Sequence, residues 1–187
     1  MQGLLAVSRS IDRILKFFAT VGGWLGAVLV FVVCYDVVTR YFGVPKFFGF
    51  TSTMLQESEY WLHSFLIVFC VGWAYTRNAH VRIDLLRDGF SNKTKYRIEI
   101  LGNLCFLLPY TAVGVWIAWP YMTRSFLSGE ISDSQTGLSN LWILKAGLLV
   151  LFILLALASI SQLIKSFAGL RGALTPDEEA NLLGGGH

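Results

Sequence analysis

Four long stretches without any charged side chain constrain the fold of this chain more than any other feature. The uncharged runs contain 19, 17, 24 and 19 residues and cover residues 17–35, 60–76, 100–123 and 146–164. A helix needs about 20 mostly apolar residues to cross a bilayer, with a tolerated range of about 17–25. The runs therefore predict an all-α integral membrane protein with four transmembrane helices. The expected spans are about 17–38, 58–76, 99–123 and 142–165.

The composition agrees with a membrane protein. Charged residues make up 14% of the 187 residues, whereas an average soluble domain has about 25%. The sequence therefore predicts neither a soluble enzyme nor a nucleic-acid-binding protein, because a basic soluble face with stacking aromatic residues is missing. We expect no nucleic-acid partner, and we expect membrane lipids to surround the chain.

The positions of lysine and arginine predict the orientation. Eleven of the 15 lie before the first run, between the second and third runs, or after the fourth, and four lie in the other connections. Positively charged loops stay in the cytoplasm. Both termini are therefore expected inside, in a bacterial inner membrane.

The segments outside the runs are short. Residues 1–16 alternate apolar and basic side chains at helical spacing, which predicts an amphipathic helix lying on the inner surface. Residues 169–187 are polar and are expected to form a disordered tail. We therefore expect one membrane domain over 1–168.

One small-residue motif lies in the first run. Gly22 and Gly26 form a G-x-x-x-G pair, which permits close approach of another helix backbone. The pattern leaves open whether that helix belongs to this chain or to a partner.

Residues with catalytic or cofactor-binding potential are sparse. His63 and His80 lie 17 positions apart and cannot clamp one haem, so we expect His63 to form hydrogen bonds inside the bundle. The three cysteines form no C-x-x-C pair, and no phosphate-binding loop is present. No charge lies midway along a run, where a solute carrier would need one. The sequence predicts no enzyme activity, no metal site and no cofactor.

Charged residues gather instead at the ends of the runs. Arg40 ends the first span, and Glu57 and Glu59 begin the second, so they are expected at the same interface. Either an ion pair closes this hairpin, or the charges contact water and lipid headgroups. At the other interface, His80 and Asp84 share a helical face. Attraction of basic residues to the anionic inner leaflet explains the arginines nearby but neither His80 nor Asp84.

Three groups of residues resemble the DctQ-like small membrane subunits of tripartite ATP-independent periplasmic (TRAP) transporters. They are Asp36-x-x-x-Arg40-Tyr41-Phe42-Gly43, Glu57-x-Glu59-x-Trp61, and His80-Val81-Arg82-Ile83-Asp84-Leu85. The resemblance extends to the order and spacing of the four runs, over about residues 5–168.

The resemblance implies a scaffold subunit. Its partners would be a large multi-spanning elevator-type subunit and a periplasmic solute-binding protein, in a sodium-coupled importer of an organic anion. It places Arg40, Glu57, Glu59 and Trp61 at a structural, partner or lipid interface, and His80, Arg82 and Asp84 in the inner connection. The alternative is a self-sufficient homo-oligomeric carrier.

Overall fold

The structure is a computed structural model that describes residues 1–79, 89–134 and 136–183. Within these ranges the regular elements are all helical. Four long helices are α1 (Gln2–Phe42), α2 (Ser52–Thr76), α4 (Leu108–Ser128) and α5 (Trp142–Leu170). Shorter elements are the 3₁₀ turn η1 (Phe47–Gly49), α3 (Asn92–Gly102), the π-turn η2 (Asn103–Leu107) and α6 (Pro176–Leu183).

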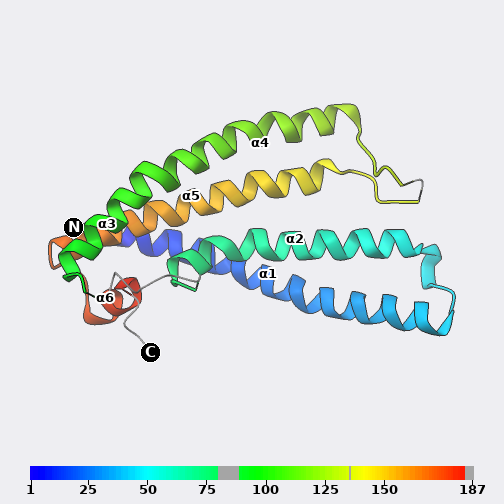
Figure 1. Cartoon of the computed structure of the whole chain (residues 1–187), viewed down its shortest axis with the longest axis horizontal. Helices are drawn as coiled ribbons and strands as arrows, with labels where there is room; N and C mark the ends of the chain where they lie inside the picture. Colours follow the sequence, from blue (N-terminus) through cyan, green and yellow to red (C-terminus); the bar gives the residue numbers. More distant parts are fainter. Residues whose placement is uncertain (80–88, 135, 184–187) are drawn as a thin grey trace.

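The long helices form two antiparallel hairpins. Figure 1 shows α1 beside α2 and α4 beside α5, with α5 lying between α4 and the first hairpin. The start of α1, α3, the end of α5 and α6 lie at one end, which we call the terminal end. The connections 43–51 and 129–141 lie at the opposite end, which we call the loop end.

Three helical segments are long and apolar enough to cross a membrane. They are α1, the continuous segment Asn92–Ser128 that contains α3, η2 and α4, and α5. The described part of the chain thus contains three candidate spans where the sequence predicted four. The prediction for 58–76 corresponds to α2, whose first half includes Gln56, Glu57, Glu59 and His63.

Helix α1 continues through residues 16 and 17, where the sequence predicted that a surface helix ends and a membrane span begins. Residues 1–16 do not form a separate surface helix but continue directly into the first span. The reason is that Leu5, Ile11 and Leu15 are buried, and the last two pack in the core beside Leu154 of α5. One side of this amphipathic segment therefore packs inside the protein. Leu4 and Val7, on another side of it, are exposed.

Polar groups fasten the same segment to α5. Asp12 accepts hydrogen bonds from Ser161 and Lys165, both at 2.6 Å. The hydroxyl of Ser8 lies 2.8 Å from that of Ser161, and Ser8 and Ser161 are both fully buried. This network and the apolar contacts together position the start of α1 along the end of α5.

Close contact between α1 and α2 sets the register of the first hairpin. A Cβ atom on Gly22 would lie 3.1 Å from the Cβ of Phe69 and 3.3 Å from the carbonyl of Leu66. A Cβ on Gly26 would meet the side chain of Leu66 at 3.4 Å. The G-x-x-x-G pair therefore faces α2 of the same chain, and it lets the two backbones approach closely.

The longest run bends at a buried polar residue. Asn103 begins the π-turn η2, and its Oδ1 accepts hydrogen bonds from Tyr75 (3.0 Å) and Ser159 (2.7 Å). Pro109 follows at the start of α4 and lacks the N–H that would continue the helical ladder. The regular α-helical hydrogen bonding of this run is thus interrupted at residues 103–109, and Figure 1 shows α3 and α4 drawn as an arc.

A short helix occupies the segment that was predicted to be a disordered tail. Thr175 and Glu178 exchange hydrogen bonds between side chain and backbone N–H, at 3.2 and 3.3 Å, with Pro176 at the first helical position. This capping box begins α6. Glu179 then accepts a hydrogen bond of 2.9 Å from Tyr96, which fastens α6 to α3.

Candidate functional site at the loop end

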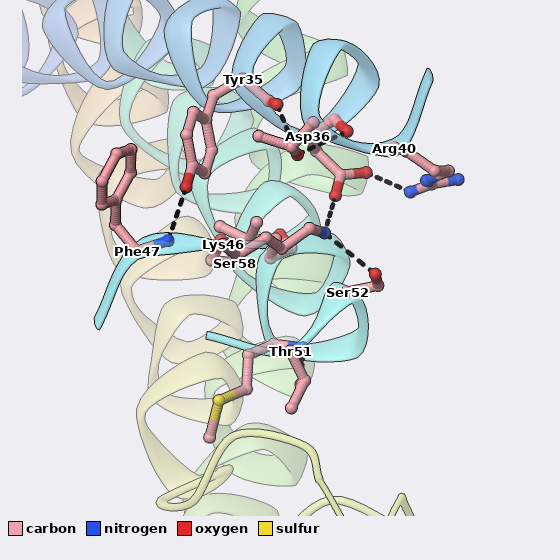
Figure 2. Close-up of polar contacts among 11 residues, drawn as sticks. Tyr35, Asp36, Arg40, Lys46, Phe47, Thr51, Ser52 and Ser58 are labelled. Carbon is pink, nitrogen blue, oxygen red and sulfur yellow. Dashed lines mark hydrogen bonds and ion pairs between the residues drawn. The ribbon is translucent and has the colours of Figure 1, made fainter. Parts of the chain in front are cut away.

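A buried carboxylate lies where α1 ends. Asp36 pairs with Arg40 through one oxygen and with Lys46 through the other, as Figure 2 shows. The side chains of Asp36 and Lys46 are 3% and 9% exposed, whereas that of Arg40 is 52% exposed. Because a buried charge without a partner is costly, loss of one member of the Asp36–Lys46 pair should destabilise the fold more than loss of the exposed Arg40.

Lys46 closes the first hairpin. Its ammonium group also donates to Ser52 at 3.0 Å, so one side chain joins the end of α1 to the start of α2. The backbone N–H of Phe47 donates to the hydroxyl of Tyr35 at 3.0 Å. Gly43 ends α1 in the left-handed conformation, with a φ of 63°, which turns the chain back.

Glu59 lies next to this cluster without a hydrogen bond. Its Oε1 is buried and accepts none from the described residues, although Asp36, Arg40 and Lys46 are near enough to interact with it electrostatically. The two acidic and two basic side chains have formal charges that cancel. The cluster therefore carries no formal excess of positive charge.

Glu57 organises the second connection. Its two carboxylate oxygens accept hydrogen bonds from the hydroxyl of Ser132 and from the N–H of Leu138, the latter at 2.5 Å. Gly137 packs so closely that a Cβ there would lie 2.6 Å from Glu57 Oε1. Thr51 adds a hydrogen bond to the carbonyl of Thr136 at 3.2 Å. The connection 129–141 is thus fastened to α2.

A third ion pair lies beside an open cavity of about 470 Å³. Lys145 contacts Glu130 at 2.5 Å, and its ammonium lies 4.2 Å from the centre of the Tyr121 ring. The hydrogen bond from Lys145 holds the pKa of Glu130 below its usual value. The role of Lys145 at the start of α5 is therefore to pair with the connection that precedes it.

The residues predicted for the hairpin are close together, but their pairing differs from the hypothesis. Arg40 forms its ion pair with Asp36 and with neither Glu57 nor Glu59, so the proposed closure through Arg40 is wrong. A cation does close the hairpin, and it is Lys46. Trp61 is half-buried on α2.

Two further predictions have different outcomes. His63 is exposed on α2, so the expectation of a histidine inside the bundle is wrong for this chain. His80, Arg82 and Asp84 lie outside the described residues.

Sequence reasoning missed Lys46 and the partners of Glu57. Lys46 is the one charged residue in the aromatic-rich connection 43–51. A single charge among apolar side chains needs a partner, so the sequence did indicate that Lys46 forms an ion pair. Ser132 and Leu138 gave no comparable signal, since a backbone N–H carries no sequence information.

The arrangement at the loop end is suited to holding helices and connections in place. Two of the three ion pairs here, Asp36–Lys46 and Glu130–Lys145, join a helix to a connection. Within residues 1–79, 89–134 and 136–183 no three histidine, cysteine, aspartate or glutamate residues gather as metal ligands. The geometry provides anchoring and no reacting pair of groups.

Comparisons with known proteins identify the family. Neither the curated proteins nor the solved structures gave a match. Residues 29–169 match the family described as tripartite ATP-independent periplasmic transporters, DctQ component. This region is about three quarters of the chain and includes the loop-end cluster, α2, α4 and nearly all of α5. The chain therefore belongs to the DctQ component family of the tripartite ATP-independent periplasmic transporters.

Proposed function

We propose that this chain is the scaffold subunit of a sodium-coupled, binding-protein-dependent importer of an organic anion, paired with a large elevator-type membrane subunit. Family membership makes the chain a transporter component, and the family is not one of enzymes. One observation carries the scaffold role: the ion pairs of the described residues lie at the two ends of the bundle. Asp36 and Lys145 pair at the loop end, and Asp12 pairs at the terminal end. A subunit that carried the solute itself would need such groups near the membrane midplane.

We further propose that α2 forms a fourth crossing. Its 25 residues would span about 37 Å at 1.5 Å per residue, which exceeds the hydrocarbon thickness of about 30 Å. The Gly22 and Gly26 contacts pack it along α1, which is itself a candidate span. With the excess of lysine and arginine at the terminal end, this topology places both termini in the cytoplasm of a bacterial inner membrane.

In this orientation the loop end faces the periplasm and the solute-binding protein. Arg40, Glu57, Glu59 and Trp61 then lie at or near the outer interface, where the connections 43–51 and 129–141 are available to a partner or to lipid headgroups. The proposed role of these residues is to fix the shape of that surface, because Glu57 fastens the longer connection.

Purification of the affinity-tagged chain from its native membrane in mild detergent tests the proposal. We expect mass spectrometry to find one large multi-spanning membrane protein at near-equal abundance. Recovery of the chain alone, or only as its own oligomer, would overturn the scaffold role. The self-sufficient carrier would then be tested by solute uptake into liposomes that contain this chain only.

A further inference from the structure

One face of α2 carries a line of exposed, mostly polar side chains. The exposed residues of this helix recur at intervals of three or four positions, so they share one face. We call this line the α2 stripe. It consists of Ser52, Gln56, Tyr60, His63 and Ile67.

The α2 stripe faces away from α5. Phe65 points toward α5, because a Cβ on Gly147 of α5 would lie 3.1 Å from its ring. His63 precedes Phe65 by two positions, which corresponds to a rotation of about 200° around the helix axis. His63 is therefore on nearly the opposite side of α2 from α5.

His63 also lies deep in the proposed membrane. Gly26 faces Leu66, and because the helices are antiparallel, three residues further along α1 correspond to three residues earlier along α2. His63 is thus level with Leu29, which is three residues from the centre of the uncharged run 17–35. That separation is about 5 Å, against a half-thickness of the hydrocarbon layer of about 15 Å.

Ser52 accepts a hydrogen bond from Lys46, but two other polar side chains of the stripe lack partners among the described residues. Neither Gln56 nor His63 has a side-chain hydrogen bond with any of the described residues. Lipid tails offer none, so polar side chains at this depth face another protein or a water-filled space. The exposed faces of the other helices differ in this respect, since Phe31 of α1 and Trp116 of α4 are 75% and 78% exposed and apolar or nearly so. Those faces suit contact with lipid.

We propose that the α2 stripe is the face on which a transmembrane helix of the large subunit docks, with its polar groups bonded to His63 and Gln56. The occupant is a helix with hydrogen-bonding side chains or exposed carbonyl groups, because His63 needs a donor or acceptor within the membrane. The proposal rests on the proposed function, since it requires a large membrane subunit as partner. It explains why the composition of α2 does not qualify it as a candidate span: part of its surface is covered by protein.

Site-specific cross-linking tests the docking face. A photoreactive phenylalanine derivative replaces Gln56, His63 or Ile67 in the complex with the large subunit identified by co-purification. Phe31 is the control position, because it lies nine residues after Gly22 and therefore on the opposite side of α1 from α2. We expect cross-links to the large subunit from the three stripe positions and few from Phe31.

The outcomes separate this inference from the proposed function. If the unmodified chain carries no large subunit, the proposed function fails. If the complex forms, the docking inference is overturned by equal yields at Phe31 and the stripe, by stripe positions that give no product, or by products that join two copies of this chain.

Substitutions of His63 test whether it forms a hydrogen bond with the large subunit or contributes only to the fit between the two surfaces. We expect His63→Leu to weaken the complex by about threefold to tenfold, which is the range for one hydrogen bond between membrane helices. His63→Gln keeps a donor and an acceptor and should retain most of the affinity. The isolated His63→Leu chain should unfold in detergent at the same temperature as the unmodified chain, because His63 bonds to no described residue. A complex that tolerates leucine as well as glutamine would overturn the proposed bond.

Discussion

The two hairpins of this molecule are closed by different means. In the first hairpin, α1 and α2 meet at Gly22, and Lys46 in the short connection bonds to both helices. In the second, α4 and α5 also meet at a glycine, since a Cβ on Gly114 would overlap the ring of Phe152. Its connection 129–141, however, is fastened partly by Glu57, which belongs to the first hairpin.

This difference means that the second connection depends on the first hairpin for its structure, but the first hairpin does not depend on the second connection. The first hairpin is closed by its own residues, whereas the second connection takes its shape partly from the first hairpin. A change in the Asp36 cluster should therefore destabilise the whole bundle, while a change at Glu57 should loosen only the connection 129–141. The four predictions below test this order, from the largest expected effect to the smallest.

Removal of the buried carboxylate should have the largest effect. Asp36→Ala leaves the ammonium of Lys46 buried without its counter-ion, and breaking a buried ion pair in this way costs about 3–5 kcal/mol. Arg40→Ala removes the exposed partner of the same carboxylate and should cost about 0–1 kcal/mol. The free energy of unfolding in detergent, measured by denaturant titration, compares the two. Equal losses would show that Lys46 does not close the hairpin.

Close packing at Gly22 gives the second prediction. Gly22→Leu would force atoms into the backbone and side chains of α2, where a Cβ alone lies 3.0 Å from Cys70 Sγ. Overpacking of this kind costs about 1–3 kcal/mol, and it should lower the unfolding temperature. Gly23→Leu is the matched control, because nothing lies within 4 Å of a Cβ at that position. Leucine has a higher helix propensity than glycine, so a similar loss at both positions would mean that the contact with α2 does not determine the effect.

Loss of the Glu57 carboxylate should act locally. Glu57→Gln replaces one acceptor oxygen with an amide and removes the charge that accepts from Leu138 N–H. Hydrogen bonds to charged groups contribute about 1.5–3 kcal/mol, so amide hydrogen exchange in 132–138 should accelerate by about tenfold to a hundredfold. Glu59→Gln should leave this exchange unchanged, since Glu59 Oε1 has no bond to any described residue. Global unfolding after Glu57→Gln would contradict the proposed order of dependence.

The smallest effect should come from pH. Lys145 holds the pKa of Glu130 below its usual value, so their contact stabilises the fold at pH values above that usual value. The stabilisation is lost as the pH falls through the lowered pKa, because the protonated carboxyl no longer pairs with the ammonium. Titration of the Glu130 carboxyl carbon by NMR should give the lowered pKa, and Lys145→Met should return it toward about 4.5. An unchanged pKa in this variant would rule out Lys145 as the cause.

The sequence predicted two of the helix ends because the hydrocarbon layer limits the length and charge of a membrane-spanning segment. The expected end of the second span at residue 76 and start of the fourth at 142 coincide with the ends of α2 and α5. The family was also predicted from residues at these helix ends, and the match over 29–169 confirms it. A rule about runs of uncharged residues, however, does not say which face of a helix is buried.

The remaining features depend on contacts between distant segments. The apolar face of residues 1–16 looks the same whether lipid or α5 covers it, so a surface helix was predicted where α1 is continuous. An ion pair between Arg40 and a glutamate was one of two hypotheses because these residues lie at one interface, but an arginine reaches a carboxylate one turn away on its own helix more easily. The capping box at Thr175 was readable and was overlooked.

The cancelling charges at the ends of the bundle have an electrical consequence. A membrane voltage does work only on charge that moves through the field, about 2.3 kcal/mol for one elementary charge over 100 mV. Asp36 with Lys46, and Asp12 with Lys165, are pairs that would each move together and contribute almost no net charge. The voltage across the membrane therefore exerts little force on these parts of the chain. In the proposed transporter, these pairs would therefore add little to the charge that the membrane voltage moves.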